Sequence, residues 1–228
     1  MLLTILYEDD DLAVCCKPAG LLSVPKEGAA EESALSSLSA LLKERGKGEV
    51  AYPVHRLDRQ TGGVMVFAKS KQAAAALSAA AAGDGMQKTY VAVTEGRPAE
   101  PAGRLCDLLY FDRQRDKTFV VTRQRRGVHE ARLTYETLAV REPDEGCPYP
   151  LALLRVRLET GRTHQIRAPL ASRRLPLYGD GRYGAKTRGG LGLFAASLTF
   201  RHPRNGQEMT VLAPFDDIFP FSLFSKDG

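Results

Sequence analysis

The chain has 228 residues, enough to bury a sizeable hydrophobic core, and we expect a single domain that spans residues 1–228. Lysine and arginine outnumber aspartate and glutamate by 32 to 27, and the formal net charge of +5 suits a polyanionic partner without identifying one. Acidic residues at 8–11 follow the first apolar ones, and no apolar run could cross a bilayer, which excludes an ordinary signal peptide and a membrane protein and favours the cytoplasm.

The start of the chain predicts a β-hairpin followed by a helix. Residues 3–7 and 12–17 are apolar runs separated by an acidic turn, which is typical of two paired strands. Leucines at helical spacing then predict a helix over residues 31–45. Gly46 is the residue expected to end that helix.

The rest of the chain predicts one more helix and a series of strands. The wholly apolar run at 64–68 predicts a buried strand, and Ser70 can cap an alanine-rich helix over 72–82 that Gly83 closes. Helices and strands that do not alternate regularly indicate an α+β fold with a mixed, largely antiparallel sheet flanked by helices. The further strands are predicted at residues 89–94, 118–122, 131–140, 151–159, 194–200 and 209–213.

The four cysteines and four histidines show no spacing typical of a metal site or a redox pair. Cys15 and Cys16 are adjacent in an apolar run and the other two, Cys106 and Cys147, are isolated, so we expect reduced, buried thiols. The G-x-G-x-x-G pattern at 179–184 is not followed by the apolar helix that a dinucleotide site requires. The sequence therefore predicts neither a metal nor a cofactor.

Two clusters of basic residues bracket the strand predicted at 118–122, like the two arms of a basic hairpin. Such a hairpin could contact the phosphates of a nucleic acid, and a solvated loop explains the same charges equally well. The clusters consist of Arg113, Arg115 and Lys117 before the strand and Arg123, Arg125 and Arg126 after it.

A lone carboxylate, Asp58, stands among ionisable neighbours in the segment 54–70. His55, Arg56 and Arg59 are close to it in sequence, and a glycine pair and an apolar run follow. A carboxylate beside positive charge stays ionised, which suits a nucleophile or a base. The same residues are explained equally well by a structural cluster of ion pairs at the end of a strand.

This segment, V-H-R-L-D-R-Q-T-G-G, resembles the H-R-L-D-x-x-T-S-G signature of the RluA family of pseudouridine synthases, which isomerise uridine in RNA. Two further segments resemble motifs of that family in the same order, K-T-Y-V-A-V at 88–93 and L-E-T-G-R-T-H-Q-I-R at 158–167. Partial matches elsewhere extend the similarity over almost the whole chain. Because it starts within the first few residues, we expect no room for the extra RNA-binding domain that family members often carry.

The resemblance implies roles for the matching residues. Asp58 is expected to be the catalytic carboxylate, Tyr90 to stack its ring on the target uracil, and Arg162 to pair with the carboxylate. Without the resemblance, Tyr90 is typical of a strand residue packed in a core. Further residues expected to contact the substrate or to form ion pairs are His55, Arg56, Arg59, Lys88, Ile166 and Arg167.

The reaction implied by the resemblance breaks the N-glycosidic bond, turns the uracil, joins its C5 to C1′ and removes the C5 proton. No redox step or group donor is involved. One carboxylate suffices, whether it attacks C6 or C1′ or acts as a base, and the residues do not choose among these. The nucleotide must flip out of its helix at a cost of a few kcal/mol, and Arg56 could fill the vacated space.

Three positions depart from the family pattern. Gly62 stands where the family usually has serine, and Phe194 replaces a common histidine. Pro169 interrupts the segment after the third motif, so the helix there should start late or kink. None of these changes removes a residue expected to be catalytic.

We interpret the chain as an RNA pseudouridine synthase that acts on rRNA or tRNA, as a monomer with no obligate protein partner. An alternative from another class is a catalytically silent RNA-binding protein with the same fold. A nucleoside hydrolase using the same carboxylate would need a second acid to activate water, and no motif places one.

Overall fold

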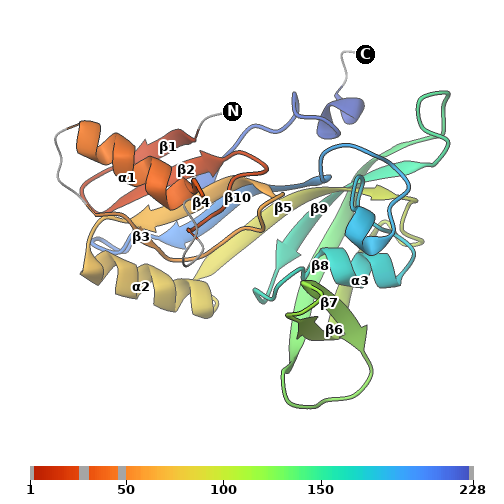
Figure 1. The fold of residues 1–228 in the computed structure, drawn as a ribbon, viewed down its shortest axis with the longest axis horizontal. Coiled ribbons are helices and arrows are strands. Elements are labelled where there is room, and N and C mark those ends of the chain that lie inside the picture. The colour runs from red at the N-terminus through yellow and green to blue at the C-terminus, as the bar shows by residue number, and fades with distance from the viewer. Residues whose placement is uncertain (1–2, 26–30, 46–49, 226–228) are drawn as a thin grey trace. The chain divides into compact units, whose positions relative to one another are not determined.

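The computed structural model describes residues 3–25, 31–45 and 50–225, and these residues form strands with few helices, as predicted for an α+β fold (Figure 1). Two compact units divide the chain: unit 1 comprises Met1–Lys88 and Ala195–Ala213, and unit 2 comprises Thr89–Phe194 and Pro214–Gly228. The chain passes from one unit to the other within two of its strands. The prediction of a single domain stays a prediction. No helix within the described ranges is long and apolar enough to span a membrane.

The strands of unit 1 follow the order β1-β2-β4-β10, with β11 paired to β10 and β3 paired to β4. The predicted hairpin is confirmed, since β1 and β2 are antiparallel. Every residue of β4 is buried, as its apolar sequence predicts. The bounds are Thr4–Glu8 for β1, Leu12–Lys17 for β2, Tyr52–Pro53 for β3, Gly62–Ala68 for β4, Leu193–Arg201 for β10 and Glu208–Leu212 for β11.

A glycine allows two strands of unit 1 to approach closely. Gly63 has a φ of +116°, and a Cβ at this position would lie 2.2 Å from the carbonyl oxygen of Ala195 in β10. No other residue fits this space or adopts this backbone conformation without strain. Because β4 begins at Gly62, the glycine pair sets the point where the loop that carries Asp58 enters the sheet.

The two helices of unit 1 lie beside its strands in Figure 1 and begin at serine caps. The helix α1 (Ala34–Glu44) starts later than predicted because the hydroxyl of Ser33 accepts a hydrogen bond from the backbone of Ser36. The expected end at Gly46 falls outside the described residues. The helix α2 (Lys71–Ala82) confirms the prediction, with Ser70 as the N-cap and Gly83 at its end.

The strands of unit 2 follow the order β5-β9-β8-β6-β7. The sequence did not predict β6, because its polar positions Arg104 and Asp107 interrupt the apolar pattern and few of its residues are buried. The bounds are Met86–Glu95 for β5, Ala102–Asp112 for β6, Lys117–Val121 for β7, Val128–Arg141 for β8 and Leu151–Leu158 for β9.

The strands β7 and β8 pair with opposite edges of β6. Leu108 of β6 is opposite Val121 on one side and opposite Glu130 on the other. The connection at 122–127 therefore crosses β6, and its Arg125 lies 4.8 Å from the ring centre of Tyr110. The expectation of one basic hairpin is corrected: the first basic cluster lies in the β6–β7 turn and at the first residue of β7, and the second lies in this crossing segment.

The helix α3 (Arg167–Ser172) explains how Pro169 is tolerated. Pro169 is in the first turn, where backbone N–H groups have no acceptor within the helix, so the missing donor costs little. The helix starts at Arg167, two residues before the proline. The aromatic residue at Phe194 packs with Phe215 and Phe221 in unit 2, which accounts for an apolar side chain at that position.

All four cysteines are free thiols, but they are not all buried as expected. Cys15 is buried within β2, whereas Cys16 and Cys147 are half-buried. Cys106 is exposed, because it lies on the outward face of β6, the strand that the sequence did not predict.

Candidate active site

Asp58 lies half-buried in the loop between β3 and β4, and the residue before it is fixed by a buried serine. The hydroxyl of Ser23 donates to the carbonyl oxygen of Leu57 at 2.7 Å and accepts from the Leu57 N–H at 2.9 Å. Both side chains are at most 4% exposed. One side of the Asp58 position is therefore anchored by two hydrogen bonds shielded from water.

The residue after Asp58 is held by a second segment. The carbonyl oxygen of Arg59 accepts a hydrogen bond from the Gly20 N–H at 2.8 Å, and the Arg59 Nε donates to the Gly20 carbonyl at 3.0 Å. The Thr61 N–H donates to the Asp58 carbonyl at 3.0 Å and closes a turn. Asp58 is thus held through the backbone on both sides.

A fully buried ammonium supports this loop. The Nζ of Lys17 donates to three carbonyl oxygens, those of Pro18 at 3.0 Å, Leu21 at 2.7 Å and Arg59 at 3.2 Å. An ammonium has three N–H donors, so its hydrogen-bonding capacity is filled. Burial lowers the pKa of Lys17 to about 8, and the nearby charge of Asp58 offsets part of this effect. Lys17 is therefore mostly charged at neutral pH and close enough to Asp58 for the two charges to attract.

The expectation that His55 contributes positive charge beside Asp58 is wrong. Burial, with a smaller contribution from the charge of Lys88, lowers the pKa of His55 to about 3. The neutral ring is used structurally, since its Nε2 accepts a hydrogen bond from the Val66 N–H at 3.1 Å. The sequence could not show this, because Val66 belongs to a strand eleven residues away.

The remaining basic residues of unit 1 that were predicted to contact substrate differ in exposure. Arg56 is exposed. Arg59 is exposed as well and forms a 3.5 Å ion pair with Glu31. Lys88 is half-buried, and burial lowers its pKa. Arg56 is accordingly the one of the three whose guanidinium is best placed to meet a large ligand at the surface.

In unit 2, Tyr90 and Arg162 have contrasting surroundings. Tyr90 lies in β5 and is 7% exposed. Arg162 lies in the loop after β9 and is exposed, with its Nε 3.3 Å from the carbonyl oxygen of Glu130. The loop itself is ordered by Gln165, whose side-chain oxygen accepts from the Arg162 N–H and from the Thr160 hydroxyl, both at 2.8 Å.

Arg167 is the second arginine of this segment, and it is buried. Its guanidinium binds both carboxylate oxygens of Asp180, at 2.7 and 2.8 Å, and it is 7% exposed. It also lies 5.1 Å from the ring centre of Tyr183. The neighbouring Ile166 is 3% exposed and belongs to the core of unit 2, so its predicted contact with substrate stays a prediction.

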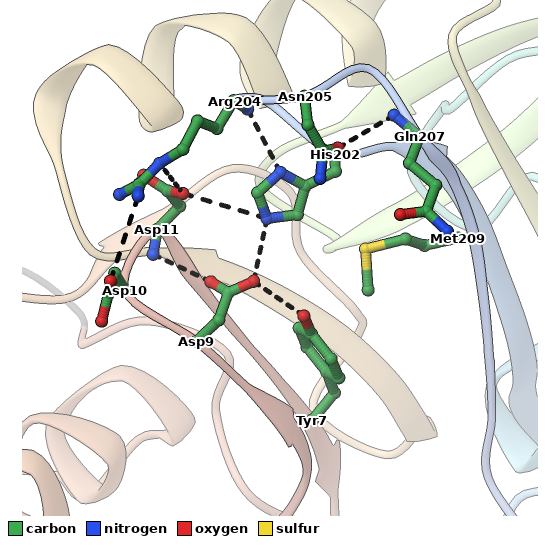
Figure 2. Close-up of a pocket in the computed structure, with 9 residues that line it drawn as sticks. All are labelled: Tyr7, Asp9, Asp10, Asp11, His202, Arg204, Asn205, Gln207 and Met209. Carbon is green, nitrogen blue, oxygen red and sulfur yellow. Dashed lines mark hydrogen bonds and ion pairs between the residues drawn. The ribbon is translucent and has the colours of Figure 1, made fainter.

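A polar cavity of about 380 Å³ in unit 1 is lined by three neighbouring side chains of the types that bind metals, Asp9, Asp11 and His202 (Figure 2). The Nδ1 of His202 accepts a hydrogen bond from the backbone of Arg204 at 3.2 Å, so its Nε2 carries the proton and donates to Asp9 at 2.8 Å. Arg204 also forms a 2.6 Å ion pair with Asp11. The histidine nitrogens are both used and a guanidinium supplies the cation, so the group does not suit a metal.

Comparisons with known proteins agree on one family. The family described as RNA pseudouridylate synthase matches residues 11–172. The ribosomal large subunit pseudouridine synthase D of Vibrio cholerae is 32% identical over 242 residues, which cover 99% of this chain and 71% of that protein. The tRNA pseudouridine synthase C of Vibrio vulnificus is 31% identical over 241 residues, which cover 99% of this chain and 95% of that protein.

The structure resembles a solved pseudouridylate synthase. Human RNA Pseudouridylate Synthase Domain Containing 4 superposes with a TM-score of 0.77 at 24% identity, over 96% of this chain and 91% of that chain. The likeness confirms the fold predicted from the sequence.

The burial of His55 predicts a measurable loss of stability in acid. Unfolded His55 binds a proton near pH 6.5, whereas the folded state resists protonation down to about pH 3, so the free energy of unfolding rises with pH between these values. His55→Gln keeps an acceptor for the Val66 N–H and cannot titrate. Between pH 4.5 and 6.5, urea denaturation should show a rise that is about 2 kcal/mol smaller in the variant than in the wild type. An unchanged rise would mean that His55 titrates normally.

Proposed function

Because this chain belongs to the RNA pseudouridylate synthase family and is therefore an isomerase that acts on RNA, we propose that it converts specific uridines to pseudouridine with Asp58 as nucleophile. The observation that carries the proposal is the anchoring of the backbone on both sides of Asp58 by Ser23, Gly20 and Lys17. A nucleophile reacts fast only when its attack geometry is fixed before the substrate arrives.

The reaction keeps all atoms of the nucleotide. The bond between N1 and C1′ breaks, the uracil turns while it stays bound, a bond forms between C5 and C1′, the C5 proton leaves to water, and N1 takes up one proton in exchange. The carboxylate of Asp58 serves by attack at C1′ or C6, or as the base that starts an elimination, and it is regenerated at the end of each path. The residues need only an ionised carboxylate at a fixed position.

Base flipping makes the glycosidic bond accessible. A stacked uridine hides its C1′ and C6 from a side chain, so the nucleotide must leave its helix at a cost of a few kcal/mol. Arg56 is exposed and precedes Asp58 by two residues. We assign to Arg56 the role of filling, with its planar guanidinium, the space that the uridine vacates. This contact offsets part of the free energy cost of unstacking.

Tyr90 is assigned to the flipped uracil. The side chain is 7% exposed, so packing fixes the position of its ring, and we assign stacking on the uracil to that ring. Its hydroxyl is the group that we assign to taking up or relaying the C5 proton. Tyr90 and Asp58 come from different units, so the two roles are proposed for each residue separately.

Two arginines of unit 2, Arg162 and Arg167, are candidates for the residue that pairs with the Asp58 carboxylate. Arg162 matches the position predicted to pair with the carboxylate, but its side chain is exposed and directed to a carbonyl. Arg167 is buried, and Asp180 fixes its guanidinium in two places. An arginine that orients a carboxylate must itself be held in place, so substitutions of Arg162 and of Arg167 are compared.

We propose rRNA or tRNA as the substrate class, because relatives named for each of these RNAs match 99% of the chain. The same proposal has the chain act in the cytoplasm as a monomer without an obligate protein partner. RNA shape, rather than a short sequence code, is expected to select the uridine.

Asp58→Asn should leave RNA affinity within about threefold and lower isomerisation roughly a hundredfold or more, because the amide keeps the shape and loses the nucleophile. Release of tritium from RNA labelled at C5 of uridine reports the reaction. Turnover by the variant within about tenfold of the wild type would remove Asp58 from its role. Tight binding by a wild type that releases no tritium would favour the catalytically silent alternative.

Arg162→Lys should lower the single-turnover rate more than Arg59→Lys, because pairing with a carboxylate needs the planar guanidinium and an outer contact needs only charge. Arg167→Lys is the matched comparison, assayed at a temperature where it stays folded. If the single-turnover rate falls equally little in Arg162→Lys and Arg59→Lys but falls more in Arg167→Lys, the arginine that pairs with the Asp58 carboxylate is Arg167.

Binding should weaken steeply with salt, as it does when basic side chains displace counterions from phosphates. Within the part of the chain that the structure describes, three arginines of the two basic clusters form neither an ion pair nor a cation–π contact, namely Arg113, Arg123 and Arg126. Reversing these three charges to glutamate should flatten the slope of log affinity against log salt by about one unit per lost phosphate contact.

The control for this experiment changes the net charge equally. It reverses three arginines of unit 2 that already face an acidic partner, Arg97, Arg141 and Arg155. The control should leave the slope nearly unchanged, because these side chains are neutralised within the protein. Equal slopes for the two triple variants would show that the basic clusters are solvated surface.

A further inference from the structure

The phenol of Tyr183 joins two segments of unit 2 that are far apart in the sequence. Tyr183 ends a short 3-10 turn, Gly181–Tyr183. Its hydroxyl lies 2.9 Å from the Thr118 N–H, 3.1 Å from the Thr118 carbonyl oxygen and 2.9 Å from the His164 Nδ1. Thr118 belongs to β7, and His164 belongs to the loop that carries Arg162.

A single assignment of protons makes all three contacts hydrogen bonds. The Thr118 N–H can only donate, and its carbonyl oxygen can only accept. The one proton of the Tyr183 hydroxyl must therefore go to that carbonyl, which leaves the His164 Nδ1 as a donor to the phenol oxygen. Phenylalanine at this position would lose all three bonds at once.

The ring of Tyr183 is fixed as firmly as its hydroxyl. The Nζ of Lys117 lies 5.0 Å from the ring centre, and the guanidinium of Arg167 lies 5.1 Å from it. Cations at these distances are attracted to the face of an aromatic ring. Burial raises the pKa of Tyr183, so the phenol keeps its proton. The ring thus bridges a residue of β7 and the first residue of α3.

One further contact joins the same segments, and a strained residue lies beside it. The hydroxyl of Thr118 donates to the carbonyl oxygen of Thr163 at 2.8 Å. His164 has a φ of +53°, a conformation that costs free energy in a residue other than glycine and persists where its surroundings hold it. The hydrogen bond that the His164 Nδ1 donates to the phenol oxygen supplies such a restraint, directly beside the residues that are predicted to act on the substrate.

We propose that Tyr183 is a positioning residue for pseudouridine formation, which couples the basic β6–β7 turn to the loop that carries Arg162. The contacts of Tyr183 hold the turn and the loop in one fixed arrangement. RNA bound by Arg113 in the turn therefore also affects the position of the loop. The proposal rests on the proposed contact between the basic clusters and RNA. Tyr183 itself need not touch the substrate.

Tyr183→Phe tests the role of the hydroxyl, because it keeps the ring that contacts the two cations. The single-turnover rate at saturating RNA should fall about tenfold, with the dissociation constant for RNA unchanged within about twofold. Tyr135→Phe is the control, since the Tyr135 hydroxyl makes one long bond, 3.4 Å, to the carbonyl oxygen of Glu100 at the surface of unit 2. The control should keep the wild-type rate.

Thr118→Val is the second variant, because it removes the other link between the segments without touching Tyr183. It should also lower the saturating rate, by a few fold. Thermal unfolding of each variant, measured beforehand, sets an assay temperature at which all are folded. Wild-type saturating rates in both variants, or losses confined to RNA affinity, would overturn the positioning role.

A double-mutant cycle with Arg113→Glu tests the coupling. In the wild type this substitution should weaken binding and also lower the saturating rate, whereas in Tyr183→Phe it should weaken binding alone. Additive effects on the saturating rate, or none from Arg113→Glu in either background, would overturn the coupling. Asp58→Asn separates the two claims: activity in that variant would reject the proposed nucleophile and leave the Tyr183 result standing.

Discussion

The loop that carries Asp58 depends on one buried ammonium. Removing the charge of Lys17 from water is costly, and the cost is offset only because three carbonyl oxygens, from Pro18, Leu21 and Arg59, accept its three N–H bonds. Methionine at this position would remove this donor from all three carbonyls, of which that of Arg59 still accepts from the Gly20 N–H, and arginine would need a planar arrangement of acceptors. The chain therefore uses a charged group at 0% exposure where an apolar one would ordinarily pack.

Unit 2 uses the same physical solution with different residues. Arg167 and Asp180 form a buried ion pair with two parallel hydrogen bonds, and Tyr183 covers the guanidinium. Removing one partner of such a pair leaves a charge uncompensated and costs about 3–5 kcal/mol. In both units, a buried charged side chain with hydrogen-bonded partners holds a segment that carries motif residues. Stability and the geometry of the proposed chemistry thus rest on the same side chains.

The elements that could be predicted from the sequence are those with a local signal. Apolar runs predict β2 and β4, and a serine cap with a terminal glycine predicts α2, because each pattern lies within a few neighbouring residues. The strand β6 was not predicted, because few of its residues are buried and its apolar pattern is interrupted. What defines it as a strand is its pairing with β7 on one edge and with β8 on the other. Its absence from the prediction also made the two basic clusters look like arms of one hairpin.

The candidate site shows the same division. The motif positions of Asp58, Tyr90 and Arg162 could be read from their neighbours in the sequence. The neutral state of His55 could not, since burial causes it. The role of Lys17 could not either, because one of its acceptors lies 42 residues away. Roles that depend on burial or on distant backbone groups become visible only once the chain is folded.

The central claim is that this chain isomerises uridine through a carboxylate held ready in its loop. Mapping pseudouridine across total RNA tests it most directly, in cells that lack the chain and in the same cells supplied with the wild type or with Asp58→Asn. The account predicts that at least one site in rRNA or tRNA loses its pseudouridine, that the wild type restores it and that the variant does not. Identical maps in all three, or restoration by the variant, would contradict the account.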